Sequence, residues 1–245
     1  MRHQTGDRRG VLTVDASSVL GKRRRLRLEG LPKKGPAIIL DMDHLSRVEP
    51  TPEFSRSISR EDVNRLPIRR YAGPIRLVAT ATDLAHAVED ILRESVVGFD
   101  TETRPAFKPG EVYLPSLVQF ATASAVYLLQ LQQQDLFDAT RDVLSSPKVI
   151  KAGVSVADDV RALKKLFAVD ERSLLDLGTV ARRHGLKQTG VRNLAAIFLG
   201  ARIPKGAKTT NWAARRLTPD QIVYAATDAW TCRELYLRFK ELKIV

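Results

Sequence analysis

Two carboxylates separated by a single residue follow an apolar segment in the middle of the chain. Asp100 and Glu102 come directly after residues 96–99, a run typical of a buried strand. Because residues i and i+2 of a strand point to the same face, both carboxylates are predicted to point the same way where the strand runs out. Paired oxygen ligands of this kind suit a divalent cation. Taken alone, however, such a pair is more often a solvated turn than a metal site.

A second acidic group consists of two adjacent aspartates, Asp158 and Asp159. They follow a short predicted strand, residues 149–152, and lie at the beginning of a predicted helix over residues 157–167. The dipole of a helix favours carboxylates at its N-terminus, and this explains one acid well and two adequately. By itself, the pair therefore does not indicate a metal site.

A third group lies near the C-terminal end of the sequence. Tyr224 and Asp228 are four residues apart in a segment predicted to be helical, so their side chains share one face. Ala225 and Ala226 between them are small and would let the helix approach another element closely. The alternative interpretation is that the phenol and the carboxylate are merely neighbours on the surface.

In combination, these groups supply what phosphodiester cleavage requires. Two metal ions ~3.5–4 Å apart hold the attacking and leaving oxygens of an in-line displacement. Four carboxylates neutralise two dications, oxygen ligands suit Mg²⁺ or Mn²⁺, and a polar residue must position the water. The single cysteine, Cys232, and histidines without metal-ligand spacing argue against a zinc hydrolase. The four histidines are His3, His44, His86 and His184.

The elements that must position these residues alternate between strands and helices from residue 71 onwards. Strands are predicted over residues 75–78, 96–99, 117–120, 125–129, 149–152 and 174–176. Helices are predicted over residues 82–92, with Thr82 as N-cap, and over residues 135–144, 157–167 and 218–237. The last begins with a strong signal, an N-cap Thr218 followed by proline and, at the third helical position, Gln221. The pattern predicts a mixed α/β sheet flanked by helices.

The remainder of the chain, residues 1–70, is predicted to be a basic and partly ordered extension of a domain that spans residues 71–245. The extension holds 16 Lys and Arg against 9 Asp and Glu, with a basic run at residues 22–27 and one apolar run at residues 37–40. It is too poor in apolar residues for a core of its own but sufficient for a strand or two to dock on the domain. Both a phosphate-binding arm and a solvated tail fit this composition.

The overall charge favours a polyanionic partner. The formal net charge is +12 and the isoelectric point is near 10.1, values typical of proteins that bind nucleic acid. We expect no membrane segment, since no apolar run reaches the ~18 residues that a spanning helix needs. The first residues lack the apolar region of a secretory signal, and the single thiol is compatible with a cytoplasmic protein.

Three segments resemble the exonuclease motifs of the DEDD superfamily: residues 99–102, 151–159 and 224–229. Tyr224 places the likeness in the DEDDy subgroup, which includes ribonuclease D and the Werner syndrome exonuclease domain. Residues 116–120, 211–212 and 217–221 extend the similarity, which covers about residues 75–240. The resemblance implies a ribonuclease-H-like sheet and hydrolysis from the 3′ end to nucleoside 5′-monophosphates.

The resemblance also implies roles for individual residues. Asp100 would bridge two divalent cations, Mg²⁺ or Mn²⁺, and Glu102 and Asp228 would complete the tighter site. Asp159 would hold the second ion, since counting from Gly153 favours it over Asp158. Tyr224 would orient the attacking water.

Contacts with the substrate are predicted at four positions. Thr103 follows the acid pair, Lys205 and Lys208 lie in a predicted loop, and Trp212 has a ring that would stack on a base. A core position for Trp212 and a solvated face for the lysines are the alternatives, and Phe107 is a further residue that would meet a base. Other basic residues cluster in the same region between the second and third motifs: Arg182, Arg183, Lys187, Arg192, Arg202, Arg215 and Arg216.

Three activities fit the sequence. The first is a metal-dependent 3′→5′ exonuclease acting on the 3′ end of DNA or RNA; the others are a catalytically silent nucleic-acid-binding module and an endonuclease or resolvase on the same scaffold. All four acids and Tyr224 are present, which argues against the silent module. The sequence leaves open the choice of DNA or RNA, of single strand or duplex, and the oligomeric state.

Overall fold

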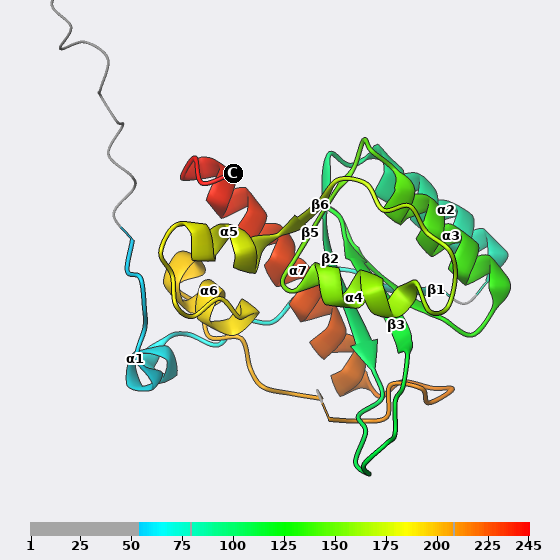
Figure 1. The fold of residues 1–245 in the computed structure, drawn as a ribbon, viewed down its shortest axis with the longest axis horizontal. Helices are drawn as coiled ribbons and strands as arrows, with labels where there is room; N and C mark the ends of the chain where they lie inside the picture. Colours follow the sequence, from blue (N-terminus) through cyan, green and yellow to red (C-terminus); the bar gives the residue numbers. More distant parts are fainter. Residues whose placement is uncertain (1–53, 79, 208) are drawn as a thin grey trace, which may run out of the picture. The chain divides into compact units, whose positions relative to one another are not determined.

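A six-stranded mixed sheet with helices on both faces forms the domain, as the sequence predicts (Figure 1). The computed structural model describes residues 54–78, 80–207 and 209–245. The sheet order is β1-β4-β3-β2-β5-β6, in which β3 runs antiparallel to both of its neighbours and the other pairs are parallel. The strands are β1 (Ile75–Val78), β2 (Val96–Thr103), β3 (Pro115–Ala121), β4 (Val126–Gln130), β5 (Ile150–Gly153) and β6 (Leu174–Asp176).

The helices divide between the two faces of this sheet. One face packs against α2, α3 and α4, and the other against α5, α6 and the long α7. The described helices are α1 (Arg60–Arg65), α2 (Ala81–Arg93), α3 (Gln134–Ser145), α4 (Val156–Leu163), α5 (Leu177–Arg183), α6 (Val191–Leu199) and α7 (Pro219–Glu241). None of the helices in the described ranges has both the length and the apolar character that crossing a membrane requires.

Most boundaries of the predicted elements agree with the structure, two predicted helices differ, and α1, α5 and α6 were not predicted individually. The capping box of Thr218 and Gln221 at the beginning of α7 is confirmed. Thr82 is not the N-cap of α2: Thr80 takes that place because Asp83 completes its capping box. The helix expected over residues 157–167 is shorter, since α4 ends at Leu163.

The central strand β2 extends further than predicted, and this changes how the acid pair is displayed. Asp100 and Glu102 do not lie beyond the end of their strand, because β2 stays paired with β3 as far as Thr103. It is the neighbour β5 that stops, since its pairing with β2 covers only residues 96–98. The half of β2 that carries the acids is therefore open on one side.

Helix α7 crosses β2 at very short range. A Cβ atom added to Gly98 would lie 1.9 Å from the backbone oxygen of Ala229, so only glycine fits at this crossing. Ala225, Ala226 and Ala229 are fully buried at the same interface. The prediction that small residues let this helix approach another element closely is confirmed.

Residues 54–70 pack on the domain, although the sequence assigned them to the extension. The ring of Phe54 lies 5.0 Å from that of Phe198, and the Arg69 amide donates to the carbonyl of Arg202 at 3.1 Å. The Tyr71 amide donates to Thr227 on α7 at 3.1 Å. The basic run at residues 22–27 and the apolar run at residues 37–40 lie outside the described residues.

Candidate active site

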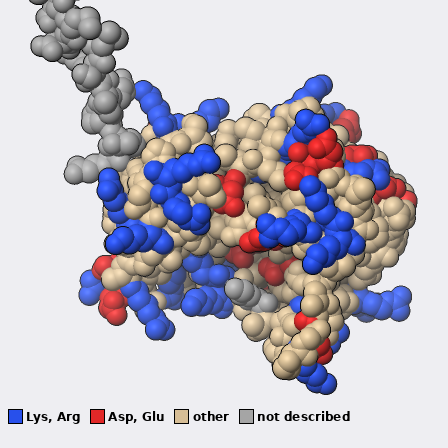
Figure 2. Space-filling model, viewed as in Figure 1, with Lys and Arg blue, Asp and Glu red and all other residues tan. Residues whose placement is uncertain are grey.

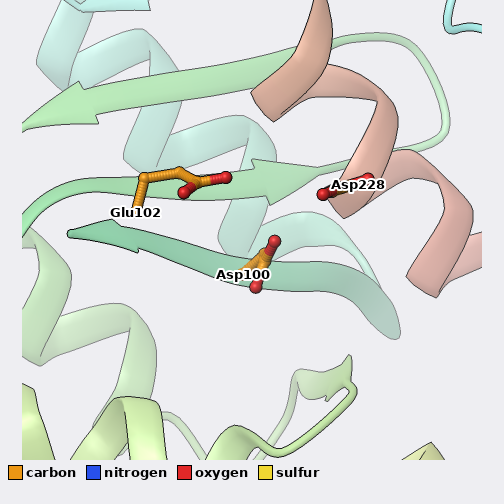
Figure 3. Close-up of side chains that lie close together, drawn as sticks. All are labelled: Asp100, Glu102 and Asp228. Carbon is orange, nitrogen blue, oxygen red and sulfur yellow. The ribbon is translucent and has the colours of Figure 1, made fainter. Parts of the chain in front are cut away.

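Three carboxylates converge where β2 meets α7. One oxygen from each of Asp100, Glu102 and Asp228 can be chosen so that all three atoms lie within 4.8 Å of one another. Figure 3 shows the side chains pointing toward one another, two from the strand and one from the helix. Glu102 and Asp228 are buried, and Asp100 is half-buried. The predicted convergence of these residues is thus what the structure shows.

This cluster concentrates negative charge in a poorly solvated place. Burial raises the pKa of Asp100 well above its usual range, and repulsion from Asp228, Asp159 and Glu102 raises it further. A divalent cation would relieve this repulsion, and oxygen-only, acidic donors are those that Mg²⁺ and Mn²⁺ prefer. The residues present therefore fit such an ion.

Asp159 faces the same region from α4 but is not one of the three clustered carboxylates. Its Oδ1 accepts a hydrogen bond from the Thr101 hydroxyl at 2.6 Å, beside the half of β2 that β5 leaves open. Burial raises the pKa of Asp159 to about 6; the Thr101 hydrogen bond opposes the shift, and repulsion from Asp158 and Asp176 adds to it.

The neighbouring Asp158 points elsewhere. Its side chain is 72% exposed and forms an ion pair with Arg161 at 2.6 Å, one turn along the same helix. Of the two adjacent aspartates, Asp159 is therefore the one beside the carboxylate cluster.

Tyr224 is held by an arginine to which the sequence assigned no particular role. Arg192, in the first turn of α6, donates from Nη2 to the Tyr224 hydroxyl at 2.8 Å, and the same nitrogen lies 3.9 Å from Asp228 Oδ2. Burial raises the pKa of Tyr224, the Asp228 charge raises it further, and Arg192 opposes both. The phenol is therefore protonated at neutral pH, and its oxygen accepts from a group that can only donate.

Arg192 is the functional candidate that sequence reasoning missed. It appears only within the basic cluster between the motifs, because 32 residues separate it from Tyr224. Their contact depends on how α6 packs against α7, which no local spacing encodes.

Trp212 is a core residue in this structure and not a platform for a base. It is fully buried, and its ring lies 6.0 Å from that of Tyr224. The prediction of a stacking contact is wrong for this conformation, because no part of the indole reaches the surface. On another side of Tyr224, a Cβ atom at Gly206 would lie 2.7 Å from the tyrosine ring, so the loop backbone packs directly on it.

The other predicted contacts are distributed around the cluster. Thr103 is half-buried at the end of β2, whereas Lys205 and Phe107 are exposed. Lys208 lies outside the described residues. A cavity of about 700 Å³ has Tyr224, Asp228 and Lys205 among its lining residues, and this volume is in the range of small-ligand sites.

Known proteins share this domain. A family model described as 3'-5' exonuclease matches residues 75–243. The mouse bifunctional 3'-5' exonuclease/ATP-dependent helicase WRN is 30% identical over 189 residues, which cover 73% of this chain and 14% of that protein. Ribonuclease D of Gluconacetobacter diazotrophicus is 33% identical over 164 residues, or 65% of this chain and 41% of the relative. The chain thus spans less than half the length of both relatives.

Solved structures agree on the fold. The Nibbler EXO domain of Aedes aegypti superimposes with a TM-score of 0.63 at 24% identity, covering 72% of this chain and 91% of the other. The catalytic core of RRP6 from Trypanosoma brucei gives 0.64 at 20% identity, covering 76% and 53%. With the family match over most of the chain, these findings show that the protein belongs to the DEDD-type 3′-5′ exonucleases.

Proposed function

We propose that the protein removes nucleotides one at a time from the 3′ end of a nucleic acid, using two divalent cations, Mg²⁺ or Mn²⁺. The observation that carries this proposal is the convergence of Asp100, Glu102 and Asp228 beside a tyrosine held by Arg192. When bound, the two ions would neutralise charge on the phosphate and hold the attacking and leaving oxygens in line.

Different carboxylates would bind each of the two ions. Asp100 is near enough to Glu102, Asp228 and Asp159 for the charge of each to raise its pKa, and this suits a ligand shared by both ions. Glu102 and Asp228 would complete one site. Asp159 would serve the second, directly or through water, after its hydrogen bond with Thr101 adjusts.

Tyr224 would position the water that attacks the terminal phosphorus. Because Arg192 donates to its oxygen, the phenol is fixed at 2.8 Å from the guanidinium, and its own proton points away from the arginine. The water oxygen gives up a proton to the solvent and forms a bond to phosphorus as the bond between phosphorus and the 3′ oxygen breaks. The shortened strand takes a proton on that oxygen, and a nucleoside 5′-monophosphate leaves.

RNA is the first substrate to test, in the light of relatives named ribonuclease D. A Trypanosoma brucei ribonuclease D solved with RNA U12 also shares the fold, with a TM-score of 0.61 at 20% identity. Nothing in the described residues reads a 2′-hydroxyl by itself, so single-stranded DNA belongs in the same experiment.

The test compares Asp100→Asn with Asp158→Asn on both substrates in Mg²⁺, in Mn²⁺ and in EDTA. Each variant removes one negative charge with little change in shape, but only Asp100 belongs to the cluster. We expect Asp100→Asn to lower kcat by about a thousandfold or more, because a shared ligand supports several kcal/mol of charge stabilisation. Asp158→Asn should stay within about twofold of wild type.

Equal activity of wild type and Asp100→Asn, in preparations free of contaminating nuclease, would rule out this site. The same panel distinguishes an active exonuclease from the catalytically silent alternative, which predicts that the oligonucleotides bind but are not shortened with either metal ion.

A further inference from the structure

A second cavity, of about 580 Å³, adjoins the active site through Arg192. Its walls come from three parts of the chain: the segment around α1, the beginning of α6 and the segment after it. The lining residues on which the inference depends are Arg60, Asn64, Gln188, Arg192, Arg202 and Lys205.

The charged residues that line this cavity are all positive. Four of its lining residues are cationic, and no carboxylate is among them. By contrast, the cavity beside Tyr224 is lined by Asp220 and Asp228 as well as Arg70 and Lys205, so its charges are balanced. Among the described residues, 54–78, 80–207 and 209–245, neither Arg60 nor Lys205 has an ion-pair partner. Their charges are available to an anionic ligand.

The walls are held in place by contacts within the protein. The Ile58 amide donates to the side chain of Gln188 at 2.9 Å, and Arg202 Nη1 donates to Asn64 Oδ1 at 3.2 Å. A bridge between Ile68 and Arg202 ties the end of the same segment to the domain. The cationic side chains are thus carried on a backbone that is positioned before any ligand arrives, which lowers the entropic cost of binding.

Two features connect this cavity to the catalytic centre. Arg192 lines it and also donates to the Tyr224 hydroxyl, 3.9 Å from Asp228. Residues 203–205 form a wall of both cavities. Figure 2 shows basic side chains gathered around a hollow in which acidic side chains are visible. The second cavity therefore lies directly beside the carboxylate site.

We propose that this cavity binds the sugar–phosphate backbone of the strand on the 5′ side of the scissile bond. The proposal rests on the proposed function and adds a binding site built in part by residues 58–64. Two or more phosphates match four cations better than a single mononucleotide does, and the apolar Ile58, Val63 and Ile203 offer contacts for sugars. Recognition of this kind is independent of base sequence.

The experiment measures binding of 5′-fluorescein-labelled single-stranded oligonucleotides by fluorescence anisotropy in EDTA, where no cleavage occurs. Arg60→Gln is compared with its matched control Arg65→Gln. Both arginines lie on α1 and both changes remove one charge, but Arg65 pairs with Asp62 and does not line the cavity. Lys205→Gln provides a second test from the opposite wall.

For an RNA or DNA strand of about 12 nucleotides, Arg60→Gln and Lys205→Gln should each raise Kd by about fivefold, the loss of one charge-assisted contact. The slope of log K against log salt should fall by about 0.7. The effect should shrink as the strand is shortened to a dinucleotide. Arg65→Gln should change Kd by less than about twofold, and all variants should unfold at the wild-type temperature.

Equal effects of Arg60→Gln and Arg65→Gln would overturn the inference, because they would reflect overall charge alone. An effect that does not depend on length, together with full competition by a nucleoside 5′-monophosphate, would assign the cavity to a mononucleotide instead. Neither result bears on the proposed cleavage, which the metal-dependent assay of Asp100→Asn tests separately.

Discussion

At the scale of single residues, the site gathers carboxylates that repel one another electrostatically when all are ionised. Burial and mutual repulsion raise the pKa of Asp100, and burial raises that of Asp159 to about 6. Bound cations would remove both penalties at once. Metal binding should therefore appear as a gain in folding stability that competes with protons.

The competition predicts how metal-induced stabilisation depends on pH. The pKa of Asp159 is higher in the folded chain than its ordinary ~3.9, so its contribution to stability is present at low pH and is lost as pH rises through about 6. Binding of a metal ion to the ionised carboxylates would compensate for this loss of folding stability. Saturating Mn²⁺ should raise the unfolding temperature by several degrees at pH ~7.5, about 2–3 kcal/mol at a hundredfold excess over Kd.

At pH ~5 the same Mn²⁺ concentration should give a clearly smaller shift, because Asp159, with a pKa of about 6, is then mostly protonated and the proton competes with the metal ion. Differential scanning fluorimetry at both pH values, with EDTA as reference, measures the effect. Shifts of equal size would contradict the assignment of these acids as ligands.

The variant Tyr224→Phe removes the hydroxyl and keeps the ring, so it tests the role of the hydroxyl alone. The ring packs against Trp212 and Gly206, so the variant should fold, but Arg192 loses one of its acceptors and the water loses its proposed partner. We expect kcat to fall by about a hundredfold, a value within the range for positioned proton-transfer groups, with KM nearly unchanged. Tyr236→Phe, on the same helix, is the control. Wild-type kcat in Tyr224→Phe would remove the hydroxyl from the mechanism.

At the scale of elements, the alternation of side chains along a strand and the capping of helices explain which features the sequence could predict. Asp100 and Glu102 share a face because strands alternate, and α7 begins at Thr218 because its capping box is local. The early end of β5, which opens one side of β2, depends on tertiary pairing. So does the contact of Arg192 with Tyr224. Trp212 could not be assigned from its type alone, since an indole serves either as core or as platform.

The crossing of β2 by α7 determines how the acids from the two elements meet. Gly98→Ala would place a methyl group 1.9 Å from the Ala229 carbonyl oxygen and push the helix away. We expect a loss of about 1–3 kcal/mol in stability, as for overpacked cores, measured by urea unfolding. Activity of the folded variant should fall further, since a shift of about 1 Å at a reacting centre costs up to a hundredfold.

Gly190→Ala is the control for this substitution, since a Cβ at Gly190 meets nothing within 4 Å. It should cost less than about 1 kcal/mol, the range for a changed N-cap. If both variants were equally stable and active, the close approach of α7 would not be what holds the site together.

At the scale of the whole molecule, an acidic centre is embedded in a strongly basic protein. The net charge of +12 favours a polyanionic partner, and under the proposed function the carboxylates would bind cations before a phosphate approaches them. Residues 54–70 belong to this arrangement, because they pack on the domain and bring Arg60 to the cavity beside Arg192. Composition predicted the polyanionic partner and allowed part of residues 1–70 to dock, whereas the structure was needed to show that residues 54–70 do so.

The proposed cleavage starts at a 3′ end, and this is its central property. The most direct measurement uses one 5′-labelled oligonucleotide with a free 3′ hydroxyl and a second whose 3′ end is blocked by an inverted terminal nucleotide. With Mg²⁺ or Mn²⁺, the free strand should shorten by single nucleotides, releasing nucleoside 5′-monophosphates, and the blocked strand should stay intact; EDTA should stop both reactions. Internal cutting of the blocked strand by the purified protein, absent from Asp100→Asn, would show an endonuclease and contradict the proposed 3′→5′ exonuclease activity.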